Sequence, residues 1–252
     1  SISNSIIPTL AQYATRAQVL DGSALTAGGS ISITAQDYTR ARSVAAGTSI
    51  GLGVNASKMY GRNFQSVTTW VDIASSMLKA GEAIGVLATS RADLYAETAA
   101  NGGGLFSGDY LRSMTTLTRS TTVNITENAH VEADYGNIVI QATSGTDDTI
   151  TTKATISSGG LVAFGTARAY TTVSTSATVN VISGAQIVNT FNTVRIVADA
   201  SMKNLRSDVS VNASGLGVRP YAYSNTNVTI TPLVNIVGSA GNRAGIAARY
   251  IE

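Results

Sequence analysis

The sequence contains no cysteine, which excludes disulfide bridges, thiolate metal sites and a cysteine nucleophile. Histidine occurs only once, so a zinc site built from several imidazoles is also excluded. Charged residues make up only 13% of the chain, and the net charge is +2. Because no dense cluster of lysine and arginine occurs, the electrostatic footprint of a nucleic-acid-binding protein is missing, and we predict no nucleic-acid partner.

Long hydrophobic runs are also absent. No run of about eighteen apolar residues occurs, so we predict no transmembrane segment in this region. The chain does not begin with methionine or a signal peptide, and it stops within the strand-like stretch "AGIAARYIE". We therefore expect a segment of a larger protein. The hydrophobic content of 44% is nevertheless sufficient for a sizeable core.

What the chain does contain is an internal repeat. One apolar pattern recurs at intervals of 50 to 56 residues, as "ISITA" (31–35), "AIGVLA" (83–88), "NIVIQA" (137–142), "TVRIVA" (193–198) and "AGIAA" (244–248). A Gly-Leu pair recurs with nearly the same period. We interpret residues 1–252 as a single segment with approximate repeats 29–81, 82–136, 137–191 and 192–242, and the start of a further repeat at 243–252.

The repeats have the residue alternation of β-strands. Apolar residues at every second position, as in Val123 and Ile125 or Val179 and Val181, predict strands with one buried and one wet face. We predict an all-β fold, a β-helix or solenoid of about four repeats of roughly 54 residues, with a β-sandwich as the alternative. Because a β-helical coil usually takes roughly 18–30 residues, we expect two or three coils per repeat and a rod on the order of 50–65 Å long.

The Gly-Leu pairs predict structural corners at Gly51, Gly104, Gly160 and Gly215, where stacked backbones approach closely and the following leucine turns into the core. The stretch "NGGGLFSGD" (101–109) has the glycines of a phosphate-binding loop. It lacks the Gly-Lys-Ser/Thr that such a loop requires. The adjacent acids Asp147 and Asp148 occur in one repeat only, so we predict a solvated turn rather than a calcium site.

Catalytic groups are scarce. His130 is the one candidate base, with Glu127, Glu132 and Asp134 nearby, and we predict that it is a polar surface residue. No acidic cluster recurs from repeat to repeat. We therefore predict no catalytic, cofactor-binding or metal-binding residue, and no enzyme activity.

Basic residues show mild clustering, at Arg40 with Arg42, Arg112 with Arg119, Lys203 with Arg206, and Arg243 with Arg249. Stacked on one face, they would form a surface for sulfated glycans. Because acids are interleaved with them, we predict a solubilising surface instead. Tyrosine is the commonest aromatic, and its position in the sequence does not separate sugar stacking from strand-edge capping.

The units "GNIVIQA" (136–142) and "SSGGLVAFGTARAY" (157–170) resemble the repeats of large bacterial filamentous adhesins, the filamentous-haemagglutinin-like and leukotoxin-family proteins. The resemblance covers about residues 28–252. It implies an extracellular location at the bacterial cell surface and a right-handed β-helical shaft. It also implies a non-enzymatic structural or adhesive function in attachment or biofilm formation, with a protein or glycan of a host or neighbouring cell as partner.

Two alternative functions remain open at this point. One is a self-assembling extracellular filament subunit, in which unpaired strands at the ends of the solenoid permit head-to-tail association. The other is a β-helical enzyme that acts on polysaccharides, for which a recurrent acidic groove would be needed.

Overall fold

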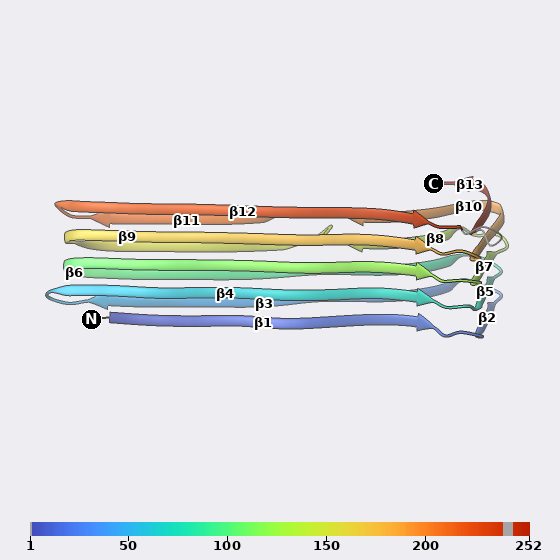
Figure 1. Ribbon diagram of the computed structural model, residues 1–252, viewed down its shortest axis with the longest axis horizontal. Helices are drawn as coiled ribbons and strands as arrows, with labels where there is room; N and C mark the ends of the chain where they lie inside the picture. Colours follow the sequence, from blue (N-terminus) through green and yellow to red (C-terminus); the bar gives the residue numbers. More distant parts are fainter. Residues whose placement is uncertain (1, 239–243) are drawn as a thin grey trace.

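A computed structural model describes residues 2–238 and 244–252, and these form strands and connecting turns with no helix. The prediction of an all-β fold is confirmed. All strand pairs are parallel and belong to one thirteen-stranded sheet system (Figure 1). The strands are β1 (Ile2–Val19), β2 (Ala24–Ala27), β3 (Ile31–Ile50), β4 (Val54–Ile73), β5 (Met77–Ala80), β6 (Ile84–Ile125), β7 (His130–Ala133), β8 (Ile138–Ser144), β9 (Thr149–Val181), β10 (Gln186–Ala200), β11 (Leu205–Ser214), β12 (Gly217–Ile236) and β13 (Gly245–Ile251).

Each strand pairs with the strand one repeat further along the chain. Ile31 pairs with Ile84, and Ile84 pairs in turn with Ile138. We call the path between two such partners a lap. The parallel pairing at this spacing is consistent with the predicted β-helix or solenoid. One lap takes a whole repeat, so the expectation of two or three coils per repeat is wrong.

The reason lies in the strand length. β3 and β4 each have 20 residues, several times the usual strand, so one lap uses up the repeat. The predicted rod of 50–65 Å is wrong for the same reason. With roughly 4.8 Å between paired strands, four or five stacked laps rise only about 20 Å.

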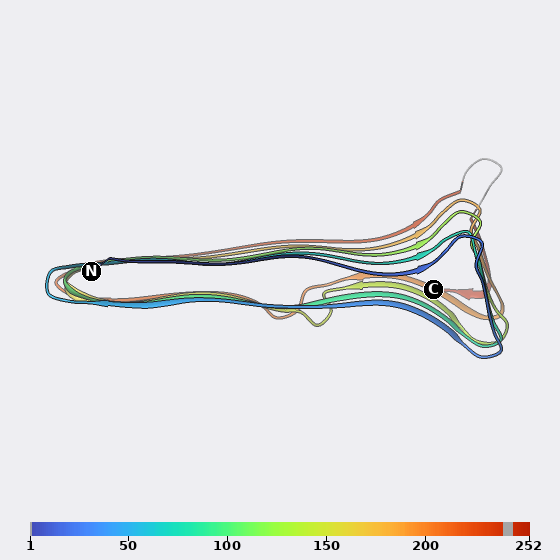
Figure 2. The ribbon, with the colours of Figure 1, turned by 90° about the horizontal axis from the view of Figure 1, so that it is seen from below.

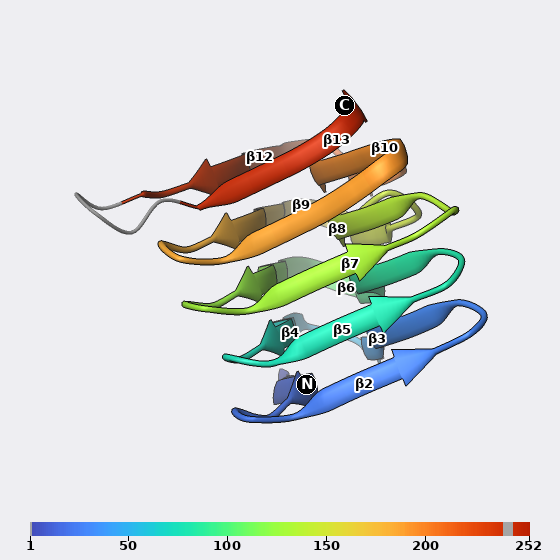
Figure 3. The same ribbon diagram turned by 90° about the vertical axis from the view of Figure 1, so that its right-hand side faces the viewer.

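The laps stack into a blade. Figure 2 shows two sheets lying face to face from a narrow edge and separating at the other end, where the cross-section widens into a triangle. β1, β4, residues 106–125 of β6, residues 162–181 of β9, and β12 form one sheet, whose outer surface we call the β4 face. β3 with its partners in β6, β9 and β11 forms the β3 face. The short strands β2, β5, β7, β13 and the start of β10 close the wide end (Figure 3).

The main hydrophobic core lies at the wide end. Inward residues of successive laps form columns, as the alternation predicts: Ile33, Val86, Ile140 and Ile196 pair one above the other. Such β-branched side chains fill a pleated surface well. Toward the narrow edge the interior becomes small and polar, because the two sheets leave no room for large apolar side chains there. Buried residues of that region include Ser49, Asn55, Ser57, Ser107, Asp109 and Ser158.

The register of the last strand differs from the sequence alignment. Residues 245–248 pair with residues 186–189, among the short strands that close the wide end, and Ile251 pairs with Val194. The alignment of "AGIAA" with "TVRIVA" is therefore wrong, because the alternation in "AGIAA" fits a short strand as well as a long one. The boundary at 242/243 and Arg243 lie outside the described residues.

Candidate functional site

The structure places Gly51, Gly104, Gly160 and Gly215 at the narrow edge of the blade, one in each of four laps. Gly104 pairs with Gly160, and the amide of Gly51 donates to the carbonyl of Gly103. A Cβ atom on Gly160 would overlap the carbonyl oxygen of Gly104, and one on Gly215 would overlap that of Gly160. Only glycine permits this close approach of stacked backbones.

The leucine after each corner glycine points outward, so the prediction that it enters the core is wrong. Leu52 and Leu216 are almost wholly exposed, and Leu105 and Leu161 about half exposed. The interior at this edge is too narrow for a leucine. In one lap it is filled by Asn55, whose side-chain amide donates to the carbonyl oxygen of Gly51 at 2.9 Å and to that of Gly103.

The β4 face gathers tyrosines with basic residues in neighbouring rows. Tyr60, Arg112, Arg168 and Tyr223 pair across four consecutive strands. Outward residues two positions before or two positions after these four on the same strands extend the group. We call it the tyrosine–arginine patch, and it comprises Lys58, Tyr60, Arg62, Tyr110, Arg112, Arg168, Tyr170, Tyr221 and Tyr223.

Each guanidinium of the patch lies over an aromatic ring. The Arg112 guanidinium is 4.8 Å from the centroid of the Tyr170 ring. The Arg168 guanidinium lies 5.6 Å from the Tyr110 ring and 5.5 Å from the Tyr221 ring, between two laps. Such cation–π contacts contribute about 0.5–1 kcal/mol each at exposed sites and hold the guanidinium over the face of the ring. The patch is therefore an ordered set of cations and rings.

The positive charge of the patch is uncompensated. Within the described chain, none of Lys58, Arg62, Arg112 and Arg168 forms an ion pair, and the Nε atoms of the three arginines have no hydrogen-bond partner. The first acid on this face, Asp72, lies at the far end of β4 and is paired with Arg16 at 3.0 Å. An anionic group is thus the partner that the patch lacks.

On the β3 face and among the short strands of the wide end, many basic residues are paired with acids, although Arg42 and Arg91 of the β3 face contact tyrosine rings instead. On the β3 face, Arg40 pairs with Asp93 at 3.5 Å and Lys153 with Glu97 at 3.3 Å. Arg206 and Asp208 form another pair there. The predicted solubilising surface of mixed charges describes this face. It does not describe the β4 face, where Arg112 lies among cations and aromatic rings.

Comparison of the chain with protein-family models, with curated proteins and with solved structures finds no match in any of the three. The patch is therefore interpreted from its own geometry. Sequence reasoning missed it by grouping Arg112 with its neighbour Arg119. The sequence does contain a signal for the patch. Arg112 and Arg168 lie one repeat apart, and each is two residues from a tyrosine, so that arginine and tyrosine side chains point out of the same face of the strand.

His130 lies at the wide end of the blade, at the start of β7. Its Nε2 is 3.1 Å from a carboxylate oxygen of Glu132, whose other oxygen accepts a hydrogen bond from Lys79 at 2.8 Å. Asp134 is 3.9 Å from the same lysine, and Glu127 lies in the preceding turn. The hydrogen bonds from Lys79 and then His130 lower the pKa of Glu132. His130, Glu132, Lys79 and Asp134 form a partly exposed ion-pair cluster rather than a base in a cleft.

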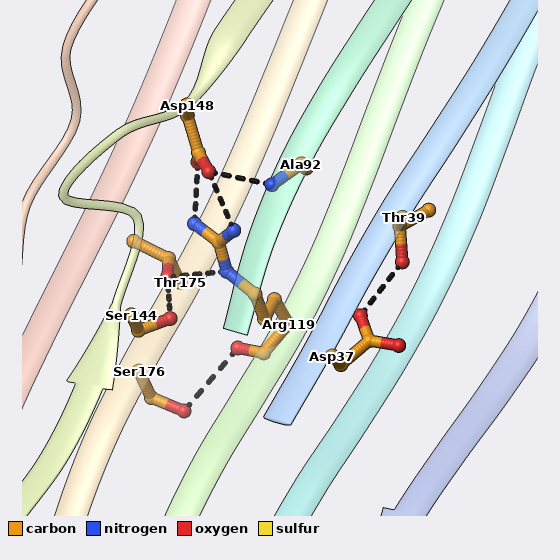
Figure 4. A network of polar contacts seen from close by, with 8 residues as sticks. All are labelled: Asp37, Thr39, Ala92, Arg119, Ser144, Asp148, Thr175 and Ser176. Atoms are coloured by element: carbon orange, nitrogen blue, oxygen red, sulfur yellow. Dashed lines mark hydrogen bonds and ion pairs between the residues drawn. The ribbon is translucent and has the colours of Figure 1, made fainter. Parts of the chain in front are cut away.

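Two buried residues contradict the sequence interpretation. Asp148, predicted in a solvated turn, and Arg119, predicted at the surface, have side chains with 0% exposure and form a two-fold ion pair at 2.6 and 2.9 Å (Figure 4). Asp148 also accepts the amide of Ala92 at 2.8 Å, and the Nε of Arg119 donates to Thr175 at 3.2 Å. The pair joins the two sheets through the interior and has a structural role.

Among the described residues, no group of three His, Asp or Glu side chains lies close enough together to hold a metal ion. The same part of the chain contains no helix with the length and apolarity needed to span a membrane.

Asp109 is a buried carboxyl group without a hydrogen-bond partner for either oxygen. It lies inside the narrow part of the blade, paired with Ser57 of the preceding lap, and is 4% exposed. Burial raises the pKa of Asp109, and the nearby Ser57 offsets only part of this effect. The folded state therefore binds this proton more tightly than the unfolded chain, so stability is lost as the pH rises through the raised pKa.

Replacing Asp109 with asparagine is expected to stabilise the protein by about 1–3 kcal/mol at neutral pH, because no unpaired carboxylate is then buried. Near pH 4, roughly the ordinary pKa of an aspartic acid, the gain should shrink toward zero. Urea unfolding at several pH values measures the difference. Asp21→Asn, in an exposed turn, is the control and should change the free energy of unfolding by less than about 0.5 kcal/mol. A constant difference across the pH range would contradict the assignment.

Proposed function

We propose that the chain is part of a β-solenoid shaft of a bacterial filamentous adhesin, non-enzymatic and located at the cell surface, that mediates attachment or biofilm formation. The tyrosine–arginine patch is the observation that supports this proposal best. Its cations have no ion-pair partner, and its rings are partly exposed on a broad face. Anionic groups of a host or neighbouring cell, on protein or glycan, complement such a surface.

The patch is built by neighbouring laps, so its contacts act together. Arg112 and Arg168 are adjacent in the stack, and Tyr60 and Tyr223 extend the same row on both sides. Strands about 4.8 Å apart place the cations densely enough for one extended anionic partner to contact several of them. Weak contacts in such a row add up to useful affinity, and salt weakens them.

Exchanging Arg112 and Arg168 for glutamine is expected to reduce attachment of the labelled protein to intact cells by roughly tenfold or more, since two cation contacts are lost. Fluorescence of washed cells measures the bound protein. The matched control is Arg42→Gln with Arg91→Gln. These arginines lie 5.2 and 5.1 Å from the Tyr95 and Tyr38 rings of the β3 face. Equal loss of attachment in both double variants would contradict a role for the patch.

The alternative functions give different results. A polysaccharide-acting enzyme releases reducing ends from a panel of polysaccharides, and an adhesive shaft releases none. A filament subunit forms fibres that electron microscopy detects, with no cells present. Either outcome would replace the adhesive proposal.

A further inference from the structure

The narrow edge of the blade carries a continuous apolar surface. We call it the apolar ridge, and it comprises Ile50, Leu52, Val54, Leu105, Phe106, Leu161, Phe164 and Leu216. The corner of each lap contributes one leucine. The backbone holds these leucines in line, since the Leu216 amide donates to the carbonyl of Leu161 at 3.0 Å and the neighbouring Phe106 pairs with Val162. The ridge therefore follows the stacking direction from lap to lap.

The ridge is exposed in the inner laps as well as at the two ends of the stack. Leu105 and Leu161 lie between neighbouring laps and are still about half exposed, and Phe106 and Phe164 are 47% exposed. Exposed apolar side chains that line up in this way mark a binding surface.

The shape of the edge restricts that partner. Figure 2 shows the two sheets meeting at a narrow, convex end. A flat and rigid protein surface would contact such an edge only along a line and leave its sides in water. A fluid apolar phase can surround it. The convex shape therefore favours lipid over another folded protein.

Charge near the ridge restricts the partner further. On the β4 face the nearest exposed charges are Arg219, in the row of Phe164, and Lys58, and both are positive. On the β3 face the first acids back from the edge are Glu97 and Asp208, each already paired with a cation of that face. The carboxyl of Asp109 is buried. A surface with negative headgroups complements this distribution.

The length of the apolar zone, measured back from the narrow edge, matches the depth to which interfacial segments enter a bilayer. Phe164 follows Leu161 by three residues, which corresponds to about 10 Å of extended strand, and interfacial segments commonly bury their apolar side chains about 5–10 Å deep. Behind this zone come Tyr110 and Tyr221, and then Arg112 and Arg168. Tyrosines at headgroup level and cations beside them form the usual order at a membrane interface.

We propose that the apolar ridge inserts into the interfacial region of a lipid bilayer with anionic headgroups, with the β4 face inclined toward the headgroups. The ridge supplies the apolar contact, and Arg219, Lys58 and the tyrosine–arginine patch supply the attraction to anionic lipid. This inference goes beyond the adhesive function, because it requires no protein or glycan on the target.

The test uses flotation of the protein with vesicles of phosphatidylcholine alone and of equimolar phosphatidylcholine and phosphatidylglycerol. The wild-type protein is expected to float with the anionic vesicles. Leu105→Ser with Leu161→Ser should weaken this binding by roughly tenfold or more. The matched control, Leu20→Ser with Leu25→Ser, removes leucines of similar exposure at the wide end and should leave binding unchanged. Circular dichroism and thermal unfolding verify that all variants are folded.

A second measurement reports insertion itself. Since the chain has no cysteine, Leu161→Cys and Leu20→Cys can each carry one environment-sensitive fluorophore. A blue shift on anionic vesicles is expected at position 161 and not at position 20. Absence of this shift would overturn the proposal.

Two partners other than lipid, a soluble polyanion and a second copy of the chain, would give different results. If the protein binds soluble dextran sulfate as it binds vesicles, and the ridge variants bind both normally, the partner is a polyanion held by the patch alone. If vesicles are not bound and the ridge variants convert a dimer into a monomer in sedimentation, the ridge joins two copies. Either result overturns the lipid proposal. The adhesive proposal requires the patch and not the ridge. Cell attachment that is lost in the Arg112 and Arg168 variant and kept in the Leu105 and Leu161 variant would therefore support the adhesive proposal on its own.

Discussion

Substitution of Asp148 by alanine is expected to lower the free energy of unfolding by about 3–5 kcal/mol. The change leaves the guanidinium of Arg119 buried with no carboxylate partner, and it removes the acceptor of the Ala92 amide. A buried, unpaired charge is among the few single defects with so large an effect. Urea unfolding monitored by circular dichroism measures the loss.

The neighbouring residue provides the control. Asp147 lies in the same turn and is exposed, so Asp147→Ala should change the free energy of unfolding by less than about 0.5 kcal/mol. The double variant Arg119→Met with Asp148→Ala should recover part of the loss, because the charge and its partner are removed together. Equal losses for Asp147→Ala and Asp148→Ala would show that the ion pair contributes little.

Introducing valine at Gly160 is expected to destabilise the protein by about 3 kcal/mol or more, because a Cβ at this corner overlaps the carbonyl oxygen of Gly104 in the preceding lap. That atom belongs to the backbone of a paired strand and cannot rotate away. The thermal unfolding midpoint should fall accordingly.

Gly108 serves as the comparison, since it lies in β6, the strand that contains Gly104, and a Cβ atom there meets nothing within 4 Å. Gly108→Ala should therefore be neutral or slightly stabilising, because it reduces the freedom of the unfolded chain. Comparable destabilisation at both glycines would contradict the attribution of the effect at Gly160 to the close approach of stacked backbones.

The sequence was sufficient for the features that recur with a fixed period. Alternation identified the strands, and the repeat spacing identified the aligned columns such as Ile140 over Val86. The number of coils per repeat could not be obtained in this way. Glycine marks where a strand can end, but it does not have to end there. Gly85 and Gly108, for example, lie within the uninterrupted strand β6, so counting glycines overestimates the number of turns.

Features that depend on contacts between distant residues could not be predicted. Arg119 and Asp148 are 29 residues apart and occur in one lap only, so no periodic signal links them. The sequence also does not show whether the leucine after each corner glycine points into the core or into solvent. That direction depends on the width of the interior, which is too small for a leucine at the narrow edge. The tyrosine–arginine patch is an intermediate case. Its arginines recur with the lap, but their grouping required the true strand register.

One lap per repeat has a consequence for how the length of such a protein can change. Duplicating or deleting a complete repeat alters the height of the stack by about 4.8 Å and leaves every remaining pair in register. Removing a single residue inside a strand reverses the inward and outward side chains that follow it. Small differences are absorbed where the chain leaves the sheet, as at residues 145–148. Related genes should therefore differ in size by whole repeats, and shorter insertions should be confined to such loops.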